Sequence, residues 1–162
     1  MMRVGQGFDV HAFDAQRPLM LGGVAIPDHP GLAGHSDADV LSHAVADALL
    51  GAASLGDLGA LFPASDRWSG ASSLDILRES ALAVERAGWS VANVDATVIG
   101  RSPKLAPHRQ QMISNLAAAV GIDGSCVSVK ATTTDDLGFI GRSEGMAALA
   151  VVLIEQPVPA RG

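Results

Sequence analysis

Aromatic side chains are scarce in this sequence, which has no tyrosine, four phenylalanines and two tryptophans among 162 residues. The core must therefore be built mostly from alanine, valine, leucine and isoleucine. These smaller side chains let helices pack closely on a sheet, but each of them buries less apolar surface. In a chain of this length, that shortage favours extra burial through oligomerisation.

Basic residues are also few, with 11 Lys and Arg against 17 Asp and Glu, which gives a net charge of −6. Binding to nucleic acids or to anionic membranes in general depends on clustered Lys and Arg. We therefore expect no nucleic-acid partner, and an anionic ligand would need a local site. The single cysteine, Cys126, excludes an internal disulfide and fits a reducing compartment.

Long apolar runs are missing as well. No segment reaches the roughly 18 residues of a membrane span, and the N-terminus lacks an apolar stretch behind basic residues. We therefore expect a cytoplasmic protein with no membrane association. The length predicts one domain over residues 1–162, in which 156–162, with two prolines, forms a flexible tail.

The first third of the chain predicts a strand, a hairpin and a helix. The strand covers 3–13, and the Gly22-Gly23 pair is typical of a tight hairpin connection. A loop is predicted over 28–34. The helix is predicted to begin close to Asp37, with Ser36 or Asp37 as its cap, because apolar residues then recur at helical spacing.

The rest of the chain alternates between helical and strand patterns. It predicts a functional loop over 56–66, a helix from Ser72 or Ser73 to Gly88, a strand over 91–99, a helix from Pro103 to Gly121, and strands over 127–134 and 146–154. The last strand is apolar on both faces, so it must be central or lie against another subunit. The order indicates an α+β fold, a mixed sheet with helices packed on one face.

Three side chains suited to a metal ion gather near the N-terminus. Asp9 and His11 are two residues apart on the predicted strand, so they project from one face about 7 Å apart. His43 would join them from the predicted helix. One carboxylate and two imidazoles are the three ligands of an open, catalytic divalent-metal site such as zinc. Each of them alone could instead be an ordinary, hydrogen-bonded polar residue.

A row of polar residues follows on the same helix. His35, Asp39, His43 and Asp47 recur every four residues and would lie in line if the helix included His35. Asp39 or Asp47 could then accept the second ring N–H of His43 and fix its tautomer. For Asp47, a solvated position on the polar face of the helix is the preferred alternative.

Two segments offer groups that bind phosphate. The strand end 130–135 carries Lys130, three threonines and Asp135, which could hold a second cation such as Mg²⁺. The segment 100–104 leads into a predicted helix N-terminus, whose free amides favour anions. The glycine-bracketed loop 138–145 presents Arg142, to bind an anion or to pair with Glu144. No phosphate-loop lysine motif or dinucleotide fingerprint is present.

Several of these motifs together resemble the 2-C-methyl-D-erythritol 2,4-cyclodiphosphate synthases of the non-mevalonate isoprenoid pathway. The likeness runs in order through nearly the whole chain. The motifs are Gly7-Phe8-Asp9-Val10-His11, His35-Ser36-Asp37, Asp57-Leu58-Gly59, Phe62-Pro63, Pro103-Lys104, Lys130-Ala131-Thr132-Thr133-Thr134, Gly138-Phe139 and Gly141-Arg142.

The resemblance implies a metal-dependent phosphorus-oxygen lyase. The family cyclises 4-diphosphocytidyl-2-C-methyl-D-erythritol 2-phosphate and releases CMP. It implies a homotrimer in which the sheets of three subunits meet and the active sites lie between subunits. It also implies Zn²⁺ at Asp9, His11 and His43, and Mg²⁺ or Mn²⁺ near Asp135.

The remaining roles are implied in the same way. His35 and Thr133 would stabilise the transition state. Substrate-binding residues would comprise Asp9, Val10, His11 and His35; Asp57, Leu58 and Gly59 at the ribose; Ser36, Phe62, Pro63, Ala64, Ser65 and Asp66 at the erythritol phosphate; Gly100, Arg101, Ser102, Pro103, Lys104, Leu105 and Ala106 with Thr132, Thr133, Thr134 and Asp135 at the cytidine diphosphate; and Phe139 and Arg142 in a substrate-linked loop.

An intramolecular phosphoryl transfer requires no enzyme nucleophile, which agrees with the lack of a Ser-His-Asp or reactive-cysteine arrangement. One departure from the family is Asp135, where a glutamate is usual, so the carboxylate reaches one methylene less far. Two other functions remain compatible with the residues. One is a metal-dependent phosphohydrolase, and the other is a non-catalytic sensor of cytidine nucleotides or isoprenoid diphosphates.

Overall fold

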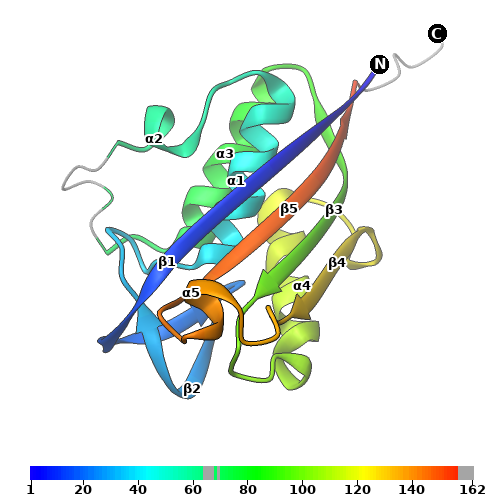
Figure 1. The fold of residues 1–162 in the computed structure, drawn as a ribbon. Coiled ribbons are helices and arrows are strands. Elements are labelled where there is room, and N and C mark those ends of the chain that lie inside the picture. The colour runs from blue at the N-terminus through cyan, green and yellow to red at the C-terminus, as the bar shows by residue number, and fades with distance from the viewer. Residues whose placement is uncertain (64–67, 69, 157–162) are drawn as a thin grey trace, which may run out of the picture.

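The computed structural model describes residues 1–63, 68 and 70–156 (Figure 1). Its sheet has the strand order β2-β1-β5-β3-β4. The strands are β1 (Met2–Leu21), β2 (Val24–Leu32), β3 (Ser90–Ile99), β4 (Val127–Thr132) and β5 (Gly145–Glu155). Strands β3 and β4 pair in parallel, and the other neighbours pair antiparallel. The sheet is therefore mixed, as predicted.

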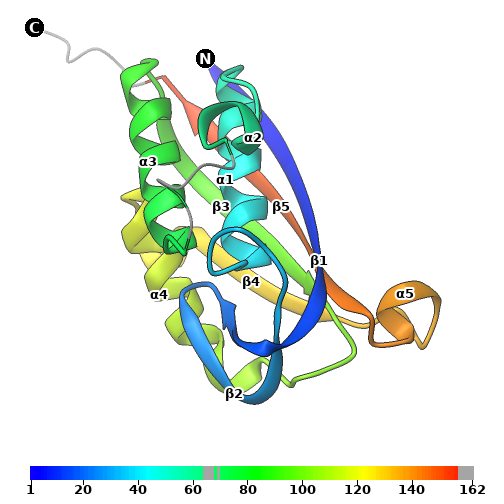
Figure 2. The same cartoon turned by 90° about the vertical axis from the view of Figure 1, so that its left-hand side faces the viewer.

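The three longer helices lie together on one face of this sheet (Figure 2). They are α1 (Val40–Ala53), α3 (Ser73–Arg86) and α4 (Arg109–Val120). Two four-residue helices, α2 (Leu58–Leu61) and α5 (Gly138–Gly141), and two 3₁₀ turns, η2 (Ala106–His108) and η3 (Gly124–Cys126), lie in the connections. This arrangement confirms the predicted fold class. Within the described part of the chain, no helix has the length and apolar character needed to span a membrane.

Strand β5 lies at the centre of the sheet, between β1 and β3. Its side chains on the helical face are completely covered, as Ala148, Ala150 and Val152 illustrate. On the other face Val151 is 40 % exposed. The continuous apolar run therefore predicted the central position correctly, and the face away from the helices remains apolar and open.

The N-terminal hairpin is longer than predicted. It turns at Gly22-Gly23 as expected, but β2 continues to Leu32, so the predicted loop over 28–34 is wrong for most of its length. Leu32 pairs with Phe13 and is almost completely buried, which gives the strand a reason to continue. Pro30 is tolerated because β2 is an edge strand, where a missing N–H costs little.

Helix α1 begins at Val40, and Asp39 is its cap, in place of the predicted Ser36 or Asp37. The Asp39 carboxylate is fully buried. It accepts hydrogen bonds from the N–H groups of Leu41 and Ser42 in the first turn of the helix, and from those of Gly22 and Gly23 in the hairpin. This one carboxylate therefore joins the helix start to the turn between β1 and β2.

We expect Asp39→Asn to lower the free energy of unfolding by about 1–3 kcal/mol, because one acceptor oxygen and the charge disappear from a buried group of donors. Urea denaturation with an unchanged m-value would measure the loss. Asp123→Asn is a suitable control, since Asp123 also caps a helical turn but is exposed to solvent. Equal stabilities for both variants would contradict the anchoring role of Asp39.

The third long helix, α4, starts at Arg109 and not at Pro103, so the predicted helix N-terminus at 100–104 is wrong. Residues 100–105 are irregular, with a cis peptide bond between Ser102 and Pro103, and the turn η2 follows them. The proline of the first helical turn is Pro107, in η2, which occupies the position that Pro103 was predicted to take.

Candidate metal and substrate site

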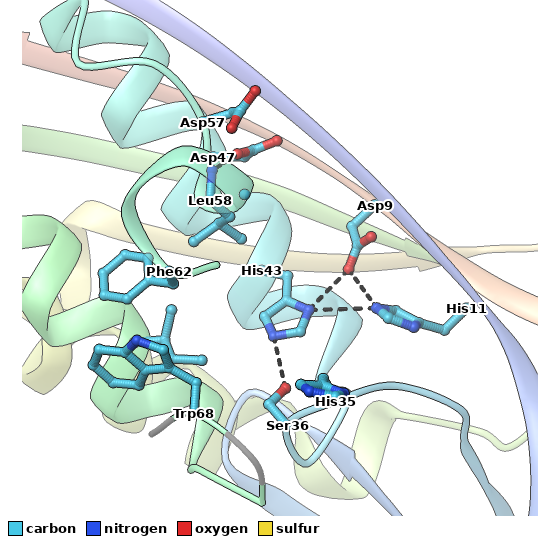
Figure 3. Close-up of a pocket in the computed structure, with 12 residues that line it drawn as sticks. Asp9, His11, His35, Ser36, His43, Asp47, Asp57, Leu58, Phe62 and Trp68 are labelled. Atoms are coloured by element: carbon cyan, nitrogen blue, oxygen red, sulfur yellow. Dashed lines mark hydrogen bonds and ion pairs between the residues drawn. The ribbon is translucent and has the colours of Figure 1, made fainter. Parts of the chain in front are cut away.

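Two glycines bring α1 directly onto β1. A Cβ atom on Gly5 would lie 1.9 Å from the carbonyl oxygen of Ala48, and one on Gly7 would lie 2.0 Å from that of Ala44. Only a glycine leaves room for the helix backbone at such a distance. The residue that precedes Ala44 on α1 is His43, so this close contact places its ring beside Asp9 and His11 on β1 (Figure 3).

The ligand atoms of these three side chains face one another. Asp9 Oδ2 lies 2.9 Å from His11 Nε2 and 3.1 Å from His43 Nδ1, and the two ring nitrogens are 3.4 Å apart. Two donor atoms bound to one tetrahedral zinc at normal bond lengths lie about 3.3 Å apart. The group could therefore hold a metal ion with little rearrangement.

The other ring nitrogens fix the histidine tautomers. His11 Nδ1 is hydrogen-bonded to the carbonyl oxygen of Ala33, so it carries the proton and leaves the Nε2 lone pair for a metal. His43 Nε2 faces the hydroxyls of Ser36 and Ser73, which leaves its Nδ1 lone pair free in the same way. With a metal ion bound, both rings would thus present an unprotonated nitrogen to the same point.

The electrostatics of the group favour a cation. Burial raises the pKa of Asp9, but the hydrogen bonds and charges of His11 and His43 outweigh it, so this pKa lies well below its ordinary value. The hydrogen bond to Asp9 raises the pKa of His11, against the effect of burial. Asp9 is therefore a permanent carboxylate, and a bound metal would replace the proton that His11 otherwise attracts.

A cavity of about 500 Å³ opens from these ligands toward α2. This volume is ordinary for a small-molecule site. Figure 3 shows most of the residues that line it. They are Asp9, His11, His35, Ser36, His43, Asp47, Asp57, Leu58, Gly59, Phe62, Trp68 and Ile76. Nine of these twelve residues were predicted as site residues, all except Asp47, Trp68 and Ile76.

The predicted row on α1 does not form. His35 precedes the helix and reaches the cavity from the loop before it, and Asp39 is occupied as the helix cap. Asp47 accepts a hydrogen bond from the N–H of Leu58, so it anchors α2 at the cavity wall. Neither Asp39 nor Asp47 is the partner of His43, and the preferred alternative of a solvated Asp47 is also wrong.

The predicted loop over 56–66 contains α2, and Asp57 is the cap of this short helix. Asp57 Oδ1 accepts a hydrogen bond from the N–H of Ala60, 2.8 Å away, while the residue lines the cavity. Phe62 packs edge-on against Trp68, with ring centroids 4.9 Å apart. Pro63 follows Phe62 but does not line the cavity, and the predicted residues Ala64, Ser65 and Asp66 lie outside the described residues.

Several contacts around the cavity were not predicted from the sequence. Ser73, at the start of α3, lies 2.9 Å from His43 Nε2, although its position suggested only a helix cap. Arg17 donates hydrogen bonds to the carbonyl oxygens of Gly34 and Ser36, and so holds the loop that carries His35. A lone serine or arginine gives no such signal, because these contacts depend on how distant segments pack.

The remaining predicted residues are not among those that line this cavity. The strand register places one residue from each of four strands in a single row across the sheet, namely Val10, Ala147, Ile99 and Thr132. Three strand spacings therefore separate His11, next in β1 after Val10, from the end of β4, a distance of roughly 14 Å. Val10 itself points to the face of the sheet away from the helices and is 43 % exposed.

The residues that follow β4 form an exposed turn. The strand ends at Thr132, two residues earlier than predicted, because Asp135 and Asp136 adopt positive φ angles of 50° and 64°. Thr133 Oγ1 lies 3.3 Å from Asp135 Oδ1. The segment 100–106 lies beside this turn, since Gly100 N–H donates to the carbonyl oxygen of Thr132. The structure thus brings these two predicted segments together, but away from the metal ligands.

Two of the predicted cations already have acidic partners. Lys130 Nζ lies 2.6 Å from Asp95 Oδ2 on the neighbouring strand β3. Arg142 Nε lies 2.6 Å from Glu144 Oε1, and this contact lowers the pKa of Glu144, while both residues are solvent-exposed. Of the two alternatives for Arg142, the structure has the pair with Glu144. Phe139, in α5, is 39 % exposed.

Comparison with known proteins identifies the family. The sequence model of the YgbB family matches residues 2–155. The chain belongs to the YgbB family. It is 58 % identical to the 2-C-methyl-D-erythritol 2,4-cyclodiphosphate synthase of Syntrophomonas wolfei over 156 residues. The aligned region covers 96 % of this chain and 99 % of that protein. The family resemblance that the motifs predicted is therefore confirmed.

Solved structures of this family have the same fold. The chain superimposes on the bifunctional IspDF from Campylobacter jejuni with a TM-score of 0.93 and 46 % identity, over 97 % of this chain and 43 % of that longer one. It superimposes on the CDP complex of IspF from Plasmodium falciparum with a TM-score of 0.84 and 34 % identity, over 97 % of both chains. These YgbB-family structures support the α+β architecture described above.

Proposed function

We propose that this chain converts 4-diphosphocytidyl-2-C-methyl-D-erythritol 2-phosphate to 2-C-methyl-D-erythritol 2,4-cyclodiphosphate with release of CMP, in isoprenoid precursor biosynthesis. The 2-phosphate oxygen forms a bond to the β-phosphorus, and the bond from this phosphorus to the oxygen of CMP breaks. The observation that carries the proposal is the Asp9, His11 and His43 group at a cavity of about 500 Å³ in a YgbB-family chain.

Asp9, His11 and His43 would hold Zn²⁺. A divalent ion at this position would polarise the attacked phosphoryl group and neutralise its developing charge. Asp135 would hold Mg²⁺ or Mn²⁺ together with the diphosphate, although its carboxylate reaches one methylene less far than the usual glutamate. With these ions the enzyme is a metal-dependent phosphorus-oxygen lyase.

The protein side chains would act mainly by positioning, because the substrate supplies its own nucleophile. His35, which lines the cavity, and Thr133 would stabilise the transition state through hydrogen bonds to phosphate oxygens. Asp57 and Gly59 would bind the ribose, and Ser36 with Phe62 would bind the erythritol phosphate side. The turn over 132–135 and the neighbouring segment 100–106 would bind the cytidine diphosphate.

We further propose that the active protein is a homotrimer with each site shared between two subunits. Within one chain, the end of β4 lies roughly 14 Å across the sheet from the metal ligands. A transition-state role for both His35 and Thr133 therefore requires Thr133 from a neighbouring copy. The open face of the sheet suits an interface, because Val4 and Phe8 on β1 are 67 % and 54 % exposed there.

The reaction itself is tested by phosphorus NMR with this substrate, Zn²⁺ and Mg²⁺, next to a sample treated with a chelator. We expect CMP and a cyclic diphosphate to form together, and only when the metals are present. Release of inorganic phosphate would instead indicate a hydrolase that uses the same metal group to activate water. Binding without any change in the substrate spectrum would indicate a sensor.

Mixing two inactive variants tests the shared site. His43→Ala removes the metal half of the site and Thr133→Ala removes the other half, and each alone should be inactive or nearly so. In trimers reassembled from an equal mixture, random assortment gives about one quarter of the sites two intact halves, so about a quarter of the wild-type turnover should return. Turnover that stays at the level of the separate variants would place both halves in one chain.

A further inference from the structure

The ring of His43 is held on both sides by different kinds of partner. Nδ1 faces Asp9 Oδ2 and His11 Nε2 within the metal group, at 3.1 Å and 3.4 Å. Nε2 faces two hydroxyls, Ser73 Oγ at 2.9 Å and Ser36 Oγ at 3.1 Å. A neutral imidazole has one N–H and one lone pair, so a ring that offers Nδ1 to a metal must donate its proton from Nε2.

Ser73 is placed to accept that proton as a hydrogen bond. Its side chain is fully buried, and its hydroxyl donates to the carboxylate of Asp37. The backbone N–H of Ser73 also donates to Asp37, with both carboxylate oxygens 3.1 Å away. A hydroxyl that donates to a carboxylate keeps its lone pairs for other donors, so the Ser73 oxygen is oriented to accept from His43.

Ser36 is less suited to this role. Its hydroxyl is slightly farther from His43 Nε2 and already accepts a hydrogen bond from the N–H of Ala38, at 3.2 Å. It also lies 3.2 Å from Ser73 Oγ, to which it can donate. The shorter contact and the carboxylate behind it favour the path from His43 through Ser73 to Asp37.

We infer that Ser73 and Asp37 are positioning residues for the metal ligand His43. The Asp37 carboxylate orients the Ser73 hydroxyl, and this hydroxyl holds His43 in the tautomer and ring orientation that present Nδ1 to the ion. Outer partners of metal-bound histidines commonly act in this way, and their loss typically weakens metal binding about 10- to 100-fold. The inference rests on the proposed metal site and adds two residues to it, one at the start of α3 and one before α1.

Titration with Co²⁺, a zinc substitute with a visible spectrum, tests the inference on the full-length metal-free protein. We expect Ser73→Ala and Asp37→Asn each to raise the dissociation constant about 10- to 100-fold. The double variant should bind little more weakly than the weaker single variant, because effects transmitted through one hydrogen-bonded path are not additive.

Ser80→Ala is the matched control. Ser80 is also a fully buried serine of α3, but its hydroxyl donates to the carbonyl oxygen of Ile76 in its own helix. We expect this variant to bind Co²⁺ as the wild type does, even if its melting temperature falls. Melting of the metal-free proteins separates a loss of folding from a loss of affinity. Should Ser73→Ala fail to fold, Asp37→Asn carries the test, since asparagine keeps an acceptor for the Ser73 N–H.

The outcomes distinguish this inference from the proposed metal site. If the wild type does not bind Co²⁺, or if His43→Ala binds it equally well, the metal site itself is wrong. If the wild type binds and His43→Ala does not, but Ser73→Ala and Asp37→Asn bind as tightly as Ser80→Ala, only the positioning role is wrong.

Discussion

Replacing His43 with alanine should abolish metal binding and turnover and leave a folded protein. His43 supplies one of three ligand atoms that lie within 3.4 Å of one another, and the remaining pair, Asp9 and His11, is too small a set for a stable zinc site. The fold should survive because the core around α1 consists mainly of apolar residues that the substitution leaves in place, such as Leu41 and Val45.

Calorimetric titration with Zn²⁺ and the rate of CMP release would measure both effects, and circular dichroism would report on folding. His108→Ala serves as the control, because His108 ends the turn η2 and does not line the cavity. It should bind zinc as the wild type does. Full activity in a folded His43→Ala protein would disprove the metal assignment.

The pairing of Asp9 with His11 in the candidate metal site could be predicted because it depends on local geometry. Asp9 and His11 share a face of β1 through the two-residue period of a strand, and this holds whatever packs around them. The central position of β5 was predictable for a similar reason, since a strand that is apolar on both faces has few other places in a sheet. Patterns along a single element were sufficient for the Asp9 and His11 pair and for β5, whereas the position of His43 depends on how α1 packs on β1.

The supporting contacts could not be predicted because they join segments far apart in the sequence. Asp39 or Asp47 was expected to accept the second ring N–H of His43. The N–H groups of Gly22 and Gly23 in the hairpin turn donate to Asp39 instead, and the N–H of Leu58 donates to Asp47. The nearer of the two hydroxyls that face His43 Nε2 is that of Ser73, which belongs to another helix. No periodicity in the sequence relates these two residues.

The start of α4 could not be predicted from the sequence for a different reason. Pro103 and Pro107 both fit the first turn of a helix, and a sequence alone does not choose between them. In the structure, Gly100 N–H donates to the carbonyl oxygen of Thr132, the next residues are irregular, and the helical turn begins only at Ala106. The sequence pattern does not contain this contact with the end of β4.

Gly7→Ala, a small substitution in β1, should strongly destabilise the protein. The added Cβ would lie 2.0 Å from the carbonyl oxygen of Ala44, and contacts shorter than 3.0 Å are essentially never seen, so α1 would have to move by about 1 Å or more. The obstacle is backbone, which cannot rotate away as a side chain can. We expect the free energy of unfolding to fall by about 3 kcal/mol or more.

The same shift should weaken the metal site in whatever fraction of the protein still folds. His43 precedes Ala44 on α1, and ligand groups function only within about 0.5 Å of their productive geometry. Urea denaturation and Zn²⁺ titration would measure the two effects on one preparation.

The matched control is Gly51→Ala, on the exposed side of α1, where an added Cβ meets nothing within 4 Å. Alanine there should raise stability by about 0.5–1 kcal/mol, because it loses less conformational entropy than glycine in a helix. A lower free energy of unfolding for Gly7→Ala and a higher one for Gly51→Ala would show that β1 must carry glycine at position 7. Only then can α1 bring His43 to Asp9 and His11. Wild-type stability and zinc affinity in Gly7→Ala would mean that the strand and the helix are not held in this contact.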